Sequence, residues 1–325
     1  MSHTPWYTSS RIAQEAWKRR TPWLPEDARQ PGMCAVTDEH GHKKQVGPLP
    51  ICLPVEYSRL NLLPSIADEA LTRFALHGIE WHGQTVAPDG RSWPSTHLLD
   101  SQVQCVNVML ALAGDQPALL QFLSSMVPGA SGLVPIEDDS VVAFEWIGGV
   151  DHLGEARGRQ RHRGRFVTSV DALLVVNSPA GRTAILVEWK FTESYDSPIA
   201  YFGPGGTDRR EVYRRRFDAT PAMFQQGVPI EAFFHEPHYQ LMRLHLMAAA
   251  MVEAGELGIE RAIVAWVVPN GNAALRTCVP EALKPFGGTV GEVWRALVHH
   301  PRVGFVDVSS DDLVAASAEV KHRYG

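Results

Sequence analysis

The sequence has few cysteines, and their arrangement is not typical of a metal-binding or disulfide-rich domain. No two of the four form a CxxC pair, and their spacing is irregular. Disulfide frameworks and zinc ribbons carry cysteines at short, regular spacings, so we expect reduced thiols in a cytoplasmic protein. The four residues are Cys34, Cys52, Cys105 and Cys278.

Long apolar runs are also missing. No stretch approaches the ~18 apolar residues that a membrane helix needs, and residues 1–20 lack the apolar centre of a secretory signal. We therefore expect a cytoplasmic protein with no membrane partner. The 325 residues suffice for one large domain or two modest ones, and 45% hydrophobic residues is ordinary for a globular protein.

Positive charge is scarce overall but concentrated locally. The formal net charge is −6, and only six of the 30 basic residues are lysines. Arginines gather in two segments, EARGRQRHRGR and DRREVYRRRF. Such segments either hold nucleic-acid phosphates or form a solvated loop, and the sequence leaves both interpretations open. The candidate nucleic-acid contacts are Arg157, Arg159, Arg161, Arg163, Arg165, Arg209, Arg210, Arg214, Arg215 and Arg216.

Two apolar segments, residues 169–176 and 183–191, predict buried strands joined by a short turn. Asp171 interrupts the first strand, and Glu188 and Lys190 interrupt the second. Side chains alternate between the faces of a strand, so Glu188 and Lys190 share one face and Trp189 takes the other. If the strands pair, Asp171 lies beside Glu188.

Charges at such a place are costly to bury unless they pair or hold a metal. They fit either an internal salt-bridge network or a site for Mg²⁺, with Mn²⁺ as a substitute. In the second interpretation, Asp171, Glu188 and the carbonyl oxygen of Trp189 supply oxygen ligands. Lys190 then orients the attacking water or stabilises the transition state of phosphodiester hydrolysis.

From residue 97 the pattern predicts a helix, three strands, a helix and a strand, which favours a mixed sheet covered by helices. Residues 192–237 and most of residues 1–60 beyond a helix at 11–20 are expected to be irregular. The other expected helices are 64–77, 97–114, 117–126, 238–255, 291–300 and one starting near 310. The expected strands are 140–149, 169–176, 183–191, 261–271 and 302–308.

This order, with Asp on the second strand and Glu-x-Lys on the third, resembles the PD-(D/E)XK nuclease superfamily. More narrowly, TSVDALL and ILVEWKFTESY, preceded by THLLDSQVQCVNVM, resemble a family of uncharacterised bacterial restriction endonucleases over roughly residues 95–270. The sequence departs from the superfamily's name, because Val170 stands where the name has Pro. The resemblance implies an α/β fold with a restriction-endonuclease-like αβββαβ core in residues 96–325, its mixed central sheet flanked by helices. Residues 1–95 would form a helical or irregular extension.

The resemblance also assigns site residues. Asp171 and Glu188 match the metal ligands and Lys190 matches the catalytic lysine of these nucleases. Gln240, near the start of a predicted helix, matches the glutamine that assists many such sites, and Glu145 matches an acidic residue ahead of the aspartate. A hydrogen bond at the helix start remains an alternative for Gln240, and a simple strand-end charge remains one for Glu145.

The Glu-x-Lys motif alone is not specific, because residues 319–321 fit it too. That copy lies in a predicted helix, where residues two apart do not share a face. The specificity therefore comes from the buried strand and the Asp-bearing strand before it.

The activity implied by the resemblance is a Mg²⁺-dependent endodeoxyribonuclease of restriction and defence type. Its implied partners are DNA, a second copy of the chain, since double-strand cutting needs two active sites, and a cognate methyltransferase. Two alternatives stay open: a nuclease acting on RNA or on branched or damaged DNA, and a nuclease-like protein that binds DNA without cleaving it.

Overall fold

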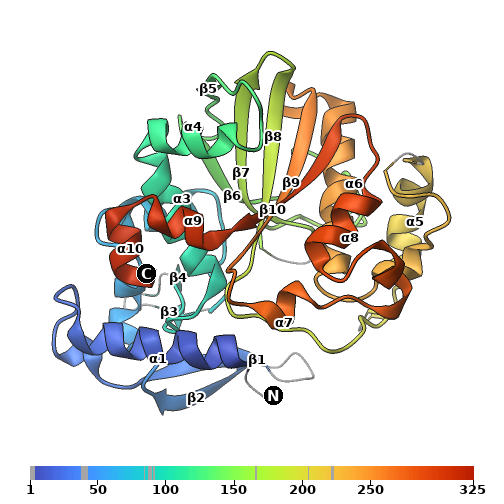
Figure 1. The fold of residues 1–325 in the computed structure, drawn as a ribbon. Coiled ribbons are helices and arrows are strands. Elements are labelled where there is room, and N and C mark those ends of the chain that lie inside the picture. The colour runs from blue at the N-terminus through green and yellow to red at the C-terminus, as the bar shows by residue number, and fades with distance from the viewer. Residues whose placement is uncertain are drawn as a thin grey trace. The chain divides into compact units, whose positions relative to one another are not determined.

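The computed structural model describes residues 4–37, 43–83, 85–86, 90, 92–164, 167–203, 205–220 and 223–325 (Figure 1). The chain folds into two compact units. The first unit comprises Met1–Asp115 and Ser310–Gly325, and the second, here called the sheet unit, comprises Gln116–Ser309. Among the described residues, no single helix is both long and apolar enough to cross a membrane.

The sheet unit is built on one mixed sheet, in which the described strands follow the order β10-β9-β8-β7-β5, with β6 also pairing with β7. β7 runs antiparallel to β5, β6 and β8, whereas β8, β9 and β10 are mutually parallel. The strands are β5 (Gly132–Leu133), β6 (Val142–Trp146), β7 (Val170–Ser178), β8 (Gly181–Trp189), β9 (Arg261–Val268) and β10 (Val303–Ser309).

The β7–β8 hairpin forms the centre of this sheet. Residues 172–176 of β7 are fully buried, which explains why they read as a continuous apolar run rather than an alternating one. Ser178 pairs with Gly181 across a two-residue loop. Gly181 has a φ of 94°, a backbone conformation that side-chain-bearing residues rarely adopt, so the glycine permits this tight turn.

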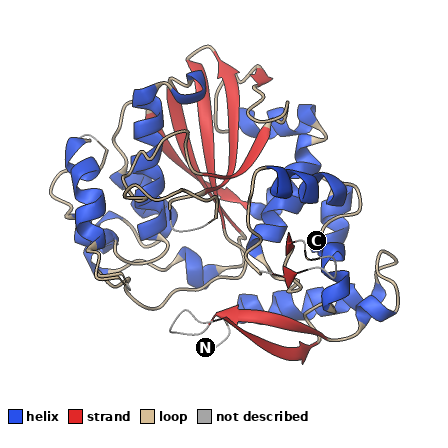
Figure 2. Cartoon of the chain, turned by 180° about the vertical axis from the view of Figure 1, so that it is seen from behind, coloured by secondary structure: helices blue, strands red, loops and turns tan. Residues whose placement is uncertain are grey.

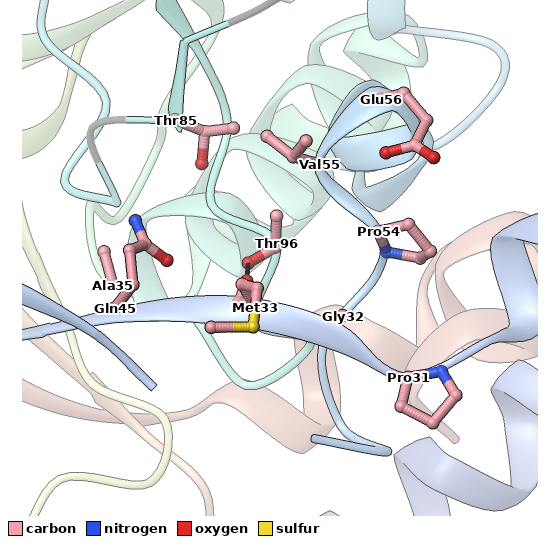
Figure 3. A pocket seen from close by; sticks show the side chains of 10 residues that line it. All are labelled: Pro31, Gly32, Met33, Ala35, Gln45, Pro54, Val55, Glu56, Thr85 and Thr96. Atoms are coloured by element: carbon pink, nitrogen blue, oxygen red, sulfur yellow. Dashed lines mark hydrogen bonds between the residues drawn. The ribbon is translucent and has the colours of Figure 1, made fainter. Parts of the chain in front are cut away.

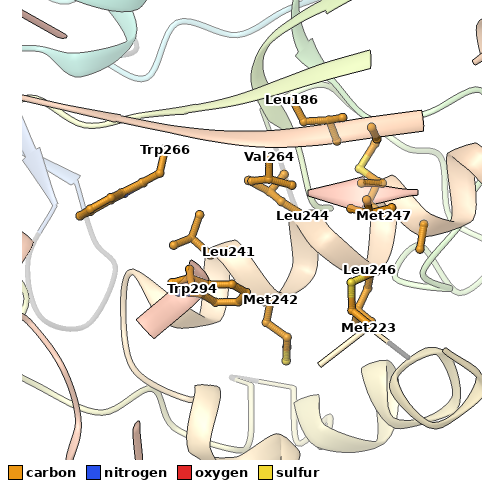
Figure 4. Packing of buried hydrophobic residues seen from close by; sticks show 14 of the residues in the cluster. Leu186, Met223, Leu241, Met242, Leu244, Leu246, Met247, Val264, Trp266 and Trp294 are labelled. Carbon is orange, nitrogen blue, oxygen red and sulfur yellow. The ribbon is translucent and has the colours of Figure 1, made fainter. Parts of the chain in front are cut away.

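Helix α6 covers much of the sheet, packing against β8, β9 and β10 (Figures 1 and 2). It ends at Gly255, which has left-handed backbone angles. Figure 4 shows how Leu241, Leu244 and Trp294 from the helices meet Leu186 and Val264 from the strands. The helices of this unit are α4 (Gln116–Ser124), α5 (Arg209–Ala219), α6 (His238–Ala254), α7 (Ala273–Arg276) and α8 (Val290–Leu297).

The first unit brings the two ends of the chain together. Gln14 Nε2 donates to the carbonyl of Arg323 at 3.0 Å, and the Arg323 guanidinium lies 3.8 Å from the ring centre of Trp17. Its helices are α1 (Pro5–Arg20), α2 (Ala67–Leu76), α3 (Ser101–Ala113), α9 (Ser310–Ala315) and α10 (Ala318–Tyr324). Its strands are β1 (Gly32–Thr37), β2 (Lys43–Leu49), β3 (Thr85–Val86) and β4 (Ser92–Trp93). Short 3-10 segments lie at Asp27–Arg29, Val55–Asn61, Ile230–Phe233, Glu256–Gly258 and Glu281–Phe286.

The predicted mixed sheet flanked by helices is confirmed, and two predictions of irregular chain are wrong. Residues 192–237 contain α5, whose sequence has charges on every side and buries only Tyr213, so it shows no apolar stripe. Gly32–Thr37 and Lys43–Leu49 form the antiparallel strands β1 and β2. These strands do not alternate cleanly, and Pro48 interrupts the second, which hid the pattern.

The prediction of reduced thiols throughout is also wrong, because Cys34 and Cys52 form a disulfide. They stand 18 residues apart in sequence, and the β1–β2 pairing brings them together. The two units do not coincide with the predicted domains 1–95 and 96–325. Asn107 on α3 bonds to Leu63 N and to Tyr324 Oη, so both α3 and the chain end belong to the first unit.

Candidate active site

Three carboxylates occupy adjacent positions across three neighbouring strands of the sheet unit. Ala172 on β7 pairs with Val187 on β8, which places Asp171 opposite Glu188. On the other side, Phe144 and Trp146 on β6 pair with Ala172 and Val170, so Glu145 is the residue opposite Asp171. Directly opposed residues of antiparallel strands are close neighbours. We call Glu145, Asp171 and Glu188 the acidic row.

Lys190 joins this row at the end of β8. Its Nζ lies 2.7 Å from Glu188 Oε1, and both side chains are buried. The contact agrees with the expected sharing of one face by Glu188 and Lys190. Lys190 N donates to the carbonyl of Val267 at 2.9 Å, which continues the pairing with β9 and holds the lysine in place.

Asp171 accepts a hydrogen bond of 2.6 Å from Trp189 N and remains partly exposed. Burial raises the pKa of the Asp171 carboxyl well above its ordinary value, and the negative charge of Glu188 raises it further. Lys190 acts in the opposite direction, and Glu145 adds to the rise. The row therefore concentrates negative charge at a place where a cation would be stabilised.

Lys190 keeps its own charge. Burial alone would lower the pKa of the Lys190 ammonium, but Glu188, Tyr195, Asp171 and Glu193 outweigh burial and raise this pKa well above its ordinary value. The lysine is thus a fixed cation and hydrogen-bond donor at neutral pH. A neutral lysine acting as a general base does not fit this environment.

Glu145 has an unusual backbone conformation for a residue inside a strand. Its φ is 48°, and its side chain is only 3% exposed. A non-glycine residue with positive φ is strained, and such strain is found preferentially at functional sites. The strand register places Glu145 opposite Asp171, and its negative charge adds to the rise of the Asp171 pKa.

Trp189 separates the two charged residues of β8. Its indole is 1% exposed, as expected for the face opposite Glu188 and Lys190. The backbone N–H of Trp189 orients Asp171, and the proposed ligand role of its carbonyl oxygen stays a prediction.

Gln240 lies in the first turn of α6. Its backbone N–H donates to Glu236 Oε2 at 3.3 Å, and its side-chain Oε1 is buried without a hydrogen-bond partner among the described residues. Buried acceptors are rarely left unpaired. This free acceptor favours a role toward a ligand or water over a hydrogen bond within the helix start.

Three residues near Lys190 were not predicted from the sequence: Glu193, Tyr195 and Glu236. Burial raises the Glu236 pKa, and the positive charges of Arg243 and Lys190 lower it. Glu193 and Tyr195 follow the strand at two-residue spacing, which was the available signal. Asn272 Nδ2 donates to the carbonyl of Glu193 at 3.0 Å, which anchors this segment beside the lysine.

The arginines of the first cluster differ in the groups that they contact. Arg161 donates to the carbonyls of residues 147–150, and Arg163 pairs with Glu137, so both organise the chain after β6. Arg157 and Arg159 instead line a cavity of about 890 Å³. Arg165 lies outside the described residues.

The arginines of the second cluster differ in the same way. Arg209 lines the same cavity. Arg215 is exposed on α5. The other three have carboxylate partners, in the pairs Arg210–Asp208, Arg214–Glu231 and Arg216–Glu253. Pairing with a carboxylate leaves an arginine less available for phosphate, so Arg157, Arg159 and Arg209 are the best-placed candidates for a nucleic-acid contact.

The first unit has a separate pocket of about 540 Å³ (Figure 3). Met33, Val55 and Thr96 line it, and Thr96 Oγ1 donates to the carbonyl of Met33 at 2.7 Å. It contains no carboxylate apart from Glu56 and no lysine or arginine, so it offers no comparable chemistry.

The donor set of the acidic row fits a hard cation. Among the described residues, the only three His, Cys, Asp or Glu ligand atoms within 4.8 Å of one another belong to Cys34, Cys52 and His97, so the row is not a tight three-carboxylate cage. Mg²⁺ does not need one, because it is commonly held by one or two carboxylates together with waters and substrate phosphate. Asp171 and Glu188 would form such a pair.

Comparison with known families gives one match. A family model described as "Restriction Endonuclease associating with ARP" matches residues 11–319. No curated protein and no solved structure matches the chain. The match covers nearly the whole sequence, and it agrees with the mixed sheet flanked by helices. The chain belongs to this restriction endonuclease family and is a nuclease of restriction type.

Proposed function

We propose that the chain is a metal-dependent endonuclease that hydrolyses phosphodiester bonds of DNA. The observation that carries the proposal is the 2.7 Å contact between Lys190 and Glu188, with Asp171 opposite on the neighbouring strand. Family membership supports the reaction class. An internal salt bridge alone would not explain why Asp171 is held among two further carboxylates that raise its pKa.

Asp171 and Glu188 would hold a Mg²⁺ ion, or Mn²⁺ in its place, with Glu145 and the Trp189 carbonyl as further ligands. When bound, such a cation acts as a Lewis acid and offsets charge on the phosphate. The backbone N–H of Trp189 fixes the orientation of the Asp171 carboxylate. Because Asp171 is partly exposed while Glu188 is buried, Asp171 is the ligand nearer to solvent and substrate.

Lys190 contributes a permanent positive charge. Its raised pKa keeps the ammonium protonated, so it donates hydrogen bonds to the attacking water or to a phosphate oxygen that gains charge in the transition state. Gln240 would accept a hydrogen bond from the attacking water through its free Oε1. These roles need no movement of a proton onto Lys190.

Binding of the DNA backbone would fall to arginines of the two clusters. Arg157, Arg159 and Arg209 are best placed because they line one cavity. Contacts between arginines and phosphates dominate the affinity of proteins for nucleic acids. A local patch of this kind operates even though the net charge of the chain is −6.

We further propose that the enzyme acts as a homodimer in the cytoplasm, in defence, beside a cognate methyltransferase. Two active sites are needed to cut both strands of a duplex, and a two-fold symmetric dimer supplies them. The restriction type of the family supports the proposals of a defence role and a methyltransferase.

Cleavage assays test the proposal directly. The protein is incubated with supercoiled plasmid, unmodified phage DNA, branched DNA and RNA, in Mg²⁺ or Mn²⁺ and in EDTA, beside Lys190→Ala. We expect metal-dependent cutting of duplex DNA that the variant loses.

Each other outcome has a defined meaning. Preferential cutting of RNA or of branched DNA would replace duplex DNA as the substrate. DNA binding without any cutting, by wild type and variant alike, would contradict the nuclease proposal and favour a binding protein. Equal cutting by Lys190→Ala would move the site away from the acidic row.

A further inference from the structure

The cavity beside α5 and α6 has apolar and aromatic lining residues that a phosphate-binding patch does not require. Its volume is about 890 Å³, and its lining comes from four separate segments of the sheet unit. Four arginines contribute to it, and so do apolar and aromatic residues such as Ile199 and Tyr239. A backbone phosphate needs only cations, so the apolar and aromatic wall requires another explanation.

This cavity adjoins the candidate active site. Glu236 lines it, and Glu236 Oε2 accepts a hydrogen bond of 3.3 Å from the backbone N–H of Gln240, a candidate residue of the active site. One residue therefore belongs to the surroundings of both.

The inner wall is a rigid, hydrogen-bonded cluster around Arg243. Glu155 accepts from Tyr213 Oη at 2.7 Å and from Thr168 Oγ1 at 2.7 Å, and Arg243 lies 3.8 Å from Glu155. The Arg243 guanidinium also sits 4.7 Å from the ring centre of Tyr239. Its Nε has no hydrogen-bond partner among the described residues, so the wall retains an unused donor.

Exposed aromatic residues stand beside Arg210, which follows the cavity-lining Arg209 in the chain. Tyr201 is 39% exposed and Phe202 is 58% exposed, both unusual for large apolar side chains. The Arg210 guanidinium lies 4.4 Å from the Tyr201 ring centre and 5.8 Å from that of Phe202. Aromatic rings beside arginines are the surfaces on which unstacked bases pack in single-strand-binding proteins.

These aromatics are held by a small hairpin. Phe202 forms a β-bridge with Asp208, and Gly203 N donates to the carbonyl of Thr207 at 2.9 Å. Arg157 Nη1 donates to Thr207 Oγ1 at 3.1 Å, which ties the first arginine cluster to the hairpin. The platform, the cations and the cavity are thus connected through one short segment.

We propose that this cavity and its aromatic platform bind one unstacked nucleotide of the substrate, either single-stranded or extruded from a duplex. The proposal rests on the nuclease function proposed above and adds the state of the substrate next to the scissile phosphate. Phe202 stacks on the base, and Arg157, Arg159 and Arg209 hold the flanking phosphates. A fully stacked duplex cannot place a base in a cavity, so the enzyme selects DNA that can release one.

The test measures binding in EDTA, where no cleavage occurs. The affinity of a short fluorescein-labelled single-stranded oligodeoxynucleotide is measured by anisotropy for wild type, Phe202→Ala and Arg209→Gln. Val150→Ala, at an exposed apolar residue, is the control for Phe202→Ala. Arg295→Gln, at an exposed arginine, is the control for Arg209→Gln. A duplex carrying one unpaired 2-aminopurine reports, through its fluorescence, whether a base leaves the stack on binding.

We expect Phe202→Ala to weaken single-strand binding by about ten-fold or more, as for loss of one stacked base. Arg209→Gln should weaken it and flatten its salt dependence, while both controls bind like wild type. On wild-type binding, 2-aminopurine fluorescence should rise, and Phe202→Ala should reduce that rise.

Equal affinities for Phe202→Ala and Val150→Ala, or no rise in fluorescence, would overturn the proposal. This outcome is distinct from failure of the nuclease function. If wild type binds the unpaired base but cuts no DNA, only the proposed nuclease function is contradicted. If wild type cuts DNA but Phe202→Ala binds as tightly as wild type, only the proposed nucleotide site is contradicted.

Discussion

Each unit of the molecule contains a deeply buried lysine, and the two are stabilised in opposite ways. Lys18 in the first unit is 1% exposed and donates to the carbonyls of Gln30, Pro50 and Cys52 at 2.7, 3.1 and 2.6 Å. Burial lowers the pKa of Lys18 to about 8. Lys190 in the sheet unit contacts the Glu188 carboxylate, and its pKa is raised.

One arginine in each unit repeats the contrast. Arg323 in the first unit bonds to the Asn61 amide oxygen and stacks on Trp17, and burial lowers its pKa to about 10. For Arg243 in the sheet unit, burial acts in the same direction, but Tyr213, Glu155 and other acidic neighbours outweigh it and raise the pKa. In the first unit, Lys18 and Arg323 donate hydrogen bonds to neutral oxygens. In the sheet unit, Lys190 and Arg243 have acidic neighbours.

Burial alone therefore does not identify a catalytic lysine. A lysine that fills its three donors with backbone carbonyls ties chain segments together and has no capacity left for a substrate. A lysine among several carboxylates retains its charge in a group that attracts a metal and a phosphate. The neighbours of each lysine distinguish a structural role from a chemical one.

The largest expected effect comes from Asp171→Asn. This change removes a proposed metal ligand and should lower metal-dependent DNA cleavage at least about 1,000-fold, equivalent to ~4 kcal/mol. The same change removes a charge that burial disfavours, so urea unfolding of the metal-free protein should show equal or greater stability. An active variant, or one strongly destabilised, would indicate that Asp171 has a structural role like that of Lys18.

The second prediction concerns Lys18→Met. Loss of the ammonium leaves buried carbonyls without a donor, so the free energy of unfolding should fall by about 3 kcal/mol or more. Urea denaturation followed by tryptophan fluorescence measures this. A change below ~0.5 kcal/mol, the range of an ordinary surface substitution, would contradict the structural role of Lys18.

The third prediction extends the comparison to buried histidines. His238 and His245 are fully buried without carboxylate partners, and burial lowers the pKa of each to about 4. Since the ordinary pKa is 6.5, the unfolded chain binds protons first as the pH falls. Stability is therefore complete above about pH 6.5 and declines toward about pH 4.

The expected loss between about pH 7 and about pH 5 is ~2 kcal/mol for each histidine, measured by urea unfolding at both values. His245 stacks on Trp294 with ring centres 4.7 Å apart, so His245→Phe preserves the packing. That variant should show a smaller pH dependence. An unchanged pH dependence would mean that His245 is not held neutral by burial.

The smallest expected effect separates two arginines of one cluster. Arg157→Gln should weaken DNA binding and lower the slope of log affinity against log salt by about 1. Arg161→Gln should leave the slope unchanged and destabilise the fold by about 1 kcal/mol, because Arg161 donates hydrogen bonds to four backbone carbonyls. Fluorescence anisotropy at several salt concentrations measures the slopes, and identical slopes would remove the distinction.

The central hairpin was predictable because its information is local. Two apolar runs and a short turn gave the pairing of Asp171 with Glu188, and strand alternation gave the shared face of Glu188 and Lys190. The helices with apolar faces, such as α3 and α6, were recognisable for the same reason. Elements without an apolar pattern, such as α5, were not.

The partners of individual side chains were not predictable from the sequence. Arg163 pairs with Glu137, 26 residues away in sequence, and Arg216 pairs with Glu253, 37 residues away. Which arginines have carboxylate partners could therefore be seen only in the folded structure. The electrostatic interaction of Glu236 with Lys190 likewise depends on the fold, because α6 begins shortly after Glu236 and packs against β8. The Cys34–Cys52 disulfide depends on the chain after β2 lying beside the start of β1, where Gly32 N donates to the carbonyl of Cys52.

One assay tests the central claim most directly. Supercoiled plasmid is incubated in Mg²⁺ with folded wild type, Lys190→Met and Lys18→Met, each with an EDTA control, below the unfolding temperature of the least stable protein. We predict that wild type and Lys18→Met cut and that Lys190→Met does not. If folded Lys190→Met cut the plasmid as fast as wild type, that result would contradict the assignment of the active site to Asp171, Glu188 and Lys190.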